Sequence, residues 1–119
     1  MNIRPQAMAM SLLLGALPAF GGAMPTVAGT WSAIDKETAA LAEAIKTGKL
    51  AEVHHHAFAI RDLVRALPAR SAAAKANARF VDVLATRLDE AGDANDKAAT
   101  ESSFQKLQGV LKDIRAEHE

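Results

Sequence analysis

The sequence predicts an all-α protein, an up-down-up-down antiparallel four-helix bundle that follows a cleaved signal peptide. Three observations predict this fold. Apolar residues recur at steps of three and four from Trp31 onward, Gly or Pro residues divide that stretch into four segments, and no segment alternates apolar and polar residues as a strand does. Because the connections are short, consecutive helices are expected to be antiparallel neighbours. A three-helix core with a detached first helix is the alternative arrangement.

Each of the four segments carries one apolar stripe. The stripes are Trp31, Ile34, Thr38, Leu41 and Ile45 in the first segment; Leu50, Val53, Ala57, Ile60, Val64 and Leu67 in the second; Phe80, Val81, Leu84, Leu88 and Ala91 in the third; and Thr100, Phe104, Leu107, Leu111, Ile114 and, at the last step, His118 in the fourth. We expect these stripes to meet in one shared core.

Local signals mark the segment boundaries. Ser32 and Asp35 resemble a capping pair at the start of the first helix. The first three segments end at Gly48, Pro68 and Gly92, because Gly adopts the left-handed position after a helix at little cost and Pro cannot continue a helix. The fourth helix is expected to start near residues 93–96, where acidic side chains suit the helix dipole.

The beginning of the chain has the pattern of a secretory signal peptide. Arg4 is the only charged residue before Asp35, and an apolar run over residues 7–17 follows it, with Pro18 at its end. The run is shorter than the roughly 20 apolar residues that a membrane-spanning helix needs. We therefore expect an exported, periplasmic protein without a stable membrane span.

Small residues near the end of the leader define two possible cleavage sites, after Ala23 and after Ala28. We expect a signal peptide over residues 1–28 and a helical domain over residues 29–119. Without the leader, 13 basic and 14 acidic residues remain, a net charge of −1. This balance leaves no basic stripe that would attract nucleic acid or anionic lipid.

The residue types of the mature domain restrict its cofactors. The chain has no cysteine, and its four methionines all lie between Met1 and Met24. These counts argue against a soft-ligand Cu(I) site and against Met-ligated haem. Covalent haem is excluded because there is no Cys-x-x-Cys-His motif. No pairing of a nucleophile with a base appears in the sequence, so we do not expect an enzyme.

Three of the four histidines are adjacent, at His54, His55 and His56. Each helical residue advances by about 100°, which places His56 within about 40° of the core residue Ile60, His54 at the boundary and His55 toward solvent. Since neighbours in a helix do not face each other, the three are not expected to close on one ion.

Metal ligands at helical spacing exist through Glu52, which lies three residues before His55 and four before His56. We predict Glu52, His55 and His56 as a half-site for Zn(II), Ni(II), Co(II) or Cu(II), completed by another helix or another chain. Glu43 and Glu101 are expected near the level of His56. A single Glu-x-x-His does not make a di-iron centre.

The other acidic residues and the fourth histidine are not predicted to be metal ligands. Asp89, Asp93 and Asp96 lack the ligand pattern of a calcium loop, and a helix end, a turn and the next N-cap explain them. His118 is expected at the end of the bundle opposite to His56.

An interface is predicted on the outer face of the second helix. Phe58 is about 160° from Ile60, between Arg61 and Arg65. An aromatic side chain opposite the core stripe favours a homodimer seam or a partner groove formed by Phe58, Arg61 and Arg65.

Three runs, at residues 57–69, 84–93 and 106–111, resemble a group of small exported helical proteins of Gram-negative bacteria. Members of this group tend to be encoded beside heavy-metal efflux and copper-resistance systems. The resemblance implies a periplasmic role near transition-metal handling, with a metal-efflux component as a partner. It assigns no ligands.

Two hypotheses follow. The protein is either a periplasmic binder or sensor of a divalent transition-metal ion, or a structural adaptor bundle that acts through the surface around Phe58.

Overall fold

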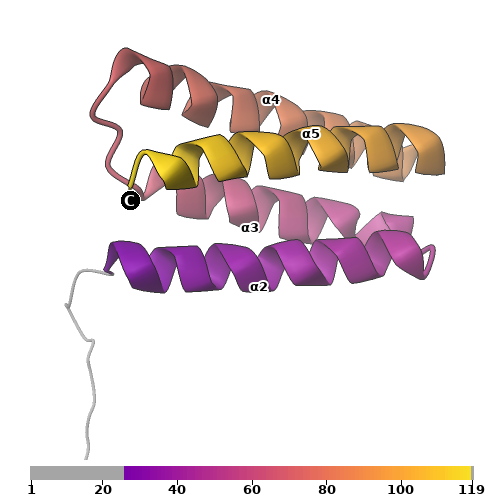
Figure 1. Ribbon diagram of the computed structural model, residues 1–119. Helices are drawn as coiled ribbons and strands as arrows, with labels where there is room; N and C mark the ends of the chain where they lie inside the picture. Colours follow the sequence, from indigo (N-terminus) through magenta and orange to yellow (C-terminus); the bar gives the residue numbers. More distant parts are fainter. Residues whose placement is uncertain (1–25, 119) are drawn as a thin grey trace, which may run out of the picture.

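The computed structural model describes residues 26–118, which form four α-helices (Figure 1). They are α2 (Val27–Lys46), α3 (Val53–Arg65), α4 (Ala72–Asp93) and α5 (Lys97–Ala116), with a short 3-10 helix, η2 (Leu50–Glu52), before α3. No helix of this part of the chain has the length and apolar character needed to cross a membrane.

The predicted signal peptide lies outside the described residues, apart from its last three, and so does the Ala23 cleavage site. Ala28 lies in the first turn of α2, whose N-cap is Thr26. Cleavage after Ala28 would therefore remove a helix cap, whereas cleavage after Ala23 would keep it.

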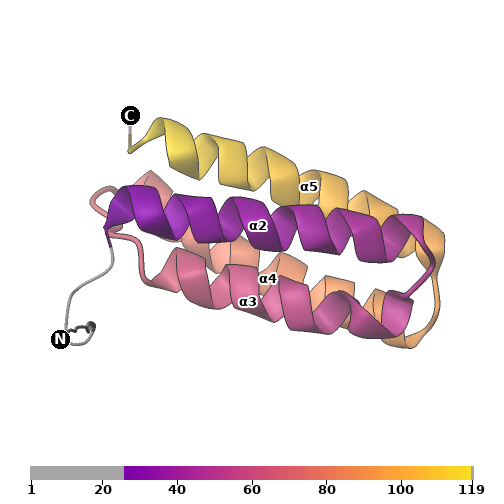
Figure 2. The same cartoon turned by 90° about the horizontal axis from the view of Figure 1, so that it is seen from below.

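The helices run up, down, up and down, as predicted, and each packs against the next in sequence. Seen from below, α2 and α5 also lie beside one another (Figure 2). Two hydrogen bonds join them, from Arg115 Nη1 and Nη2 to the two carboxylate oxygens of Asp35, at 3.0 and 2.8 Å. The first helix is thus part of the bundle, and the alternative with a detached first helix is wrong.

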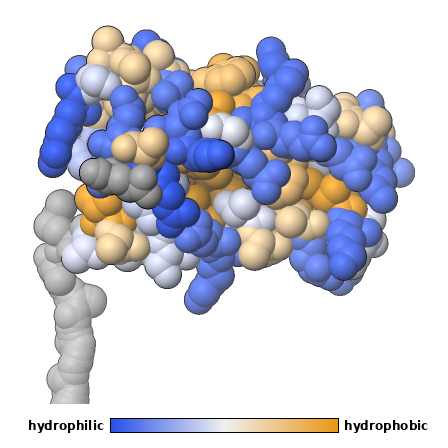
Figure 3. Space-filling view, in the orientation of Figure 1, coloured by the Kyte–Doolittle hydropathy of each residue, from blue (hydrophilic) through white to orange (hydrophobic). Residues whose placement is uncertain are grey.

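The α2–α5 seam is the most open side of the bundle. Two hollows lie along it, of about 230 Å³ near Trp31 and about 490 Å³ near Phe104, and Gln108 lines both. Hydrophobic residues are visible between the two helices in Figure 3, with hydrophilic residues around them.

Side-chain caps explain where the helices begin. The Thr26 hydroxyl accepts a hydrogen bond from the N–H of Gly29, and Ser71 and Asp96 cap α4 and α5 in the same way, at 2.9 to 3.0 Å. The predicted pair at Ser32 and Asp35 is wrong, because α2 begins at Val27 with Thr26 as its cap, and Ser32 lies inside the helix.

The predicted stripes form the core. Fully buried side chains come from all four helices: Ile34, Leu41, Val53, Ile60, Val81, Leu84, Leu88, Thr100 and Leu107. The prediction that Phe80 belongs to the core stripe of the third segment is wrong, since Phe80 is 40% exposed. Its neighbour Val81 faces the core, and the rotation of about 100° between successive residues turns Phe80 outward.

Glycines act at two different kinds of position. Gly48 ends α2 as predicted, with φ of 78° in the left-handed region. Gly92 does not end the third helix, which continues to Asp93. A Cβ on Gly92 would lie 2.6 Å from the carbonyl oxygen of Leu50, so glycine here allows η2 to pack directly on the end of α4.

Candidate metal centre

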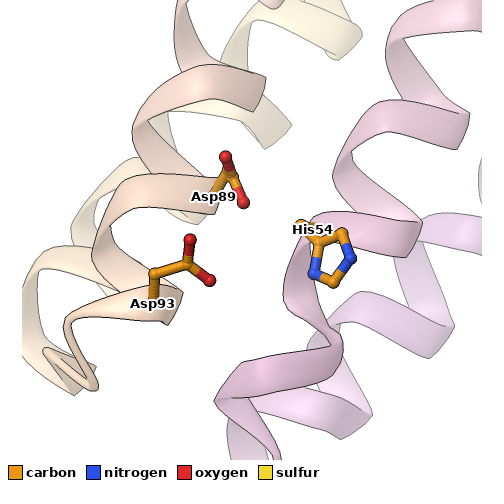
Figure 4. Close-up of side chains that lie close together, drawn as sticks. All are labelled: His54, Asp89 and Asp93. Carbon is orange, nitrogen blue, oxygen red and sulfur yellow. The ribbon is translucent and has the colours of Figure 1, made fainter.

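His54, Asp89 and Asp93 come together at the end of the bundle where α3 begins and α4 ends. Each offers one ligand atom, and these atoms all lie within 4.8 Å of one another. Figure 4 shows the two carboxylates on α4 directed toward the imidazole on α3. His54 and Asp89 are half-buried and Asp93 is exposed, so the group is open to solvent.

The local sequence explains why these side chains meet. Asp89 and Asp93 are four residues apart, so they project from the same face of α4. Val53 is fully buried, which fixes the rotation of the first turn of α3 and directs the next residue, His54, to the rim beside α4. The close packing of Leu50 on Gly92 then brings that turn near the end of α4.

The electrostatic environment of the cluster is negative. The C-terminal end of a helix carries a partial negative charge, and two carboxylates there repel both it and each other. Asp35, Asp62 and Asp82 all form ion pairs with arginines, but in residues 26–118 Asp89 and Asp93 have no Lys or Arg partner. A bound cation would neutralise this group.

The predicted ligands Glu52, His55 and His56 are placed differently. Glu52 and His55 are exposed, and Nδ1 of His56 lies 2.8 Å from Oε1 of Glu37 on α2, within hydrogen-bonding distance. Among the described residues, the group of three ligating side chains includes none of the three. The contact with Glu37 spans two helices, and the spacing within α3 gives no sign of it.

The two other predicted acidic candidates, Glu43 and Glu101, are exposed and take no part in the cluster. His118 packs edge-on against Trp31, with ring centroids 6.3 Å apart, at the end of the bundle opposite to the start of α3.

The rings of His54 and His55 lie close together although the two residues are neighbours in α3. Their centroids are 4.1 Å apart, with an angle of 34° between the ring planes. Their side chains converge although their Cα–Cβ bonds diverge.

The predicted interface residues make contacts within the chain. Phe58 is half-buried against the core, and the guanidinium carbon of Arg61 lies 4.5 Å from its ring centroid. Arg65 donates a hydrogen bond to Asp82 on α4 at 3.2 Å. With His54, these residues follow one stripe of α3, and both ends of the stripe meet acidic side chains of α4.

The sequence does not predict this cluster. Its pattern predicts His54 at the boundary of the core stripe, and Asp89 and Asp93 at a helix end and a turn. A usable signal was present, since two carboxylates at helical spacing end one helix while a histidine begins its antiparallel neighbour.

Comparison with protein-family models, with curated proteins and with solved structures finds no match for this chain.

Proposed function

We propose that this protein is an exported, periplasmic helical-bundle protein that binds a divalent transition-metal ion at His54, Asp89 and Asp93. One observation carries the proposal: three ligating side chains from two helices converge, and no cationic side chain of residues 26–118 pairs with the two carboxylates. Two carboxylates balance the charge of a divalent ion, and one imidazole favours Zn(II), Ni(II), Co(II) or Cu(II) over Mg(II).

The sequence supports a role in handling the metal as cargo. The N-terminal pattern predicts export, and the resemblance to small proteins encoded beside heavy-metal efflux systems implies an efflux component as a partner. The cluster lies at the surface, with Asp93 exposed, so that an ion held there can exchange with the surrounding solution. We therefore assign the ion to transient binding or sensing rather than to a permanent structural role.

Thermal unfolding tests this function. An ion that binds only the folded protein raises its stability by about 2.7 kcal/mol at a concentration of 100 times Kd. Tag-free mature protein should melt at a higher temperature with Zn(II), Ni(II), Co(II) or Cu(II) and not with Mg(II). The double variant Asp89→Asn, Asp93→Asn should lose the effect, and Glu52→Gln should keep it. A melting temperature indifferent to all four ions would refute metal binding.

A second candidate, the adaptor role, is favoured by a different surface from the predicted one. Phe80 and Val83 are 40% and 44% exposed, and their spacing of three places them side by side on α4. If this pair is a contact surface, Val83→Lys should dissociate a dimer or complex seen by light scattering in wild-type protein. A monomeric wild type that binds metal would leave only the first candidate.

A further inference from the structure

We propose that His55 is the fourth ligand of this centre, so that two imidazoles and two carboxylates hold a tetrahedral ion, and that the ion is Zn(II). This inference rests on the proposed function, since it completes the same site.

The positions of the two rings carry the inference. The centroids of His54 and His55 are separated by 4.1 Å. Two imidazoles on one zinc ion each have a Zn–N distance of about 2.0–2.1 Å, which brings their ring nitrogens to within about 3.5 Å of each other and makes the rings close neighbours. The observed rings are stacked more closely than two imidazoles that share a zinc ion, so the His55 side chain would have to rotate to bring one of its nitrogens to the ion.

His55 is free to make this rotation. It is exposed, and within residues 26–118 its ring contacts His54 but makes no side-chain hydrogen bond or ion pair. The other imidazole of this helix, His56, lies within hydrogen-bonding distance of Glu37 on α2. His55 is therefore the available nitrogen donor next to the cluster.

The chemistry of the completed set selects the ion. Zinc has no geometric preference from its d electrons and is usually bound by four ligands in a tetrahedron, often with nitrogen and carboxylate oxygen donors. Two aspartates neutralise its charge. Mg(II) requires an octahedral shell of oxygens, and Cu(II) and Ni(II) favour tetragonal geometry, so a tetrahedral set of two nitrogens and two oxygens suits zinc best.

The test compares wild-type protein with His55→Ala and with the matched control His56→Ala, which removes an imidazole from the same helix. Zinc affinity is measured by competition with a chromophoric chelator. Removing a partner that only orients a ligand already lowers affinity by about 10–100-fold, so loss of the ligand His55 should cost at least about tenfold. His56→Ala leaves all four proposed ligands in place, so it should lower the zinc affinity much less than His55→Ala does.

Cobalt reports the geometry directly. Co(II) bound to the wild type should show the intense visible bands of a tetrahedral ion, and His55→Ala should show the weak bands of a more highly coordinated one. X-ray absorption of the zinc complex should count two imidazoles in the wild type and one in His55→Ala. Circular dichroism of both variants checks that the bundle is intact.

The outcomes separate the two proposals. If wild type and His55→Ala bind zinc equally well with one imidazole each, His55 is not a ligand and the three-ligand centre stands. If His56→Ala loses as much affinity as His55→Ala, the assignment of His55 is overturned. If the wild type binds neither Zn(II) nor Co(II), the proposed function fails together with this inference.

Discussion

Replacing Gly92 by alanine would test whether the close packing of η2 on α4 sets the position of His54. The new Cβ would lie 2.6 Å from the carbonyl oxygen of Leu50 and 3.5 Å from Cβ of Val53. Real Cβ atoms keep at least 3.0 Å from such neighbours, so the η2 backbone must move by about 0.4 Å or more.

Two opposing effects set the size of the change. Overpacking of a tight site costs about 1–3 kcal/mol. Alanine in a helix interior is about 0.8–1.0 kcal/mol more favourable than glycine. We therefore expect Gly92→Ala to lower the free energy of unfolding by about 0–2 kcal/mol, measured by urea denaturation monitored by circular dichroism.

The chain offers a matched control in Gly109, which is exposed in α5 and has no atom within 4 Å of an added Cβ. Gly109→Ala should raise the free energy of unfolding by about 0.8–1.0 kcal/mol. Because Val53 precedes His54, Gly92→Ala should also weaken zinc binding, whereas Gly109→Ala should not. Equal stabilisation by both substitutions would refute the packing argument.

Three further results are expected. Asp93→Asn, which removes a negative charge from the C-terminal end of α4, should stabilise the metal-free protein by about 0.3–1 kcal/mol in urea denaturation while weakening its metal binding. The hydrogen bond from Arg115 holds the pKa of Asp35 below its ordinary value of 3.8. At pH values above 3.8, Asp35→Asn should therefore lower the free energy of unfolding of the protein by less than about 1 kcal/mol, because the ion pair is exposed. In thermal melts, the difference between variant and wild type should vanish as the pH falls through the pKa of Asp35 in the folded protein. Intact-mass measurement of protein from its native host should find an N-terminus at Met24 or Gly29, and a full-length cytoplasmic chain would contradict export.

The sequence alone predicts the helix faces that form the core, but not the contacts between helices. Val53, Ile60 and Val64 are buried as their spacing requires, because periodicity depends only on the geometry of one helix. The pairing of His56 with Glu37 depends on how α2 lies against α3, which no spacing within one segment encodes. The prediction that Phe80 lies in the core is wrong for a related reason. Both Phe80 and Val81 are apolar, and only the packing of the helices decides which of them faces inward.

The candidate site shows the same division. The adjacent histidines and the acidic residues at 89 and 93 are evident in the sequence, and an antiparallel arrangement puts the start of one helix beside the end of the next. What could not be predicted is the depth of that approach, which depends on Gly92 meeting the backbone of Leu50. Helical spacing instead favours Glu52 with His55 and His56, and the partners expected from other helices, Glu43 and Glu101, take no part in the cluster.

The two sides of the metal cluster lie far apart along the chain, and this separation has a thermodynamic consequence. An ion that joins His54 to Asp93 would close a loop of about 40 residues, and for a covalent link of that length the lost freedom of the unfolded chain amounts to about 4 kcal/mol. A protein that contains no cysteine would thereby gain the equivalent of a removable cross-link. Its resistance to unfolding, and with it its lifetime among proteases, would rise and fall with the free metal concentration around it.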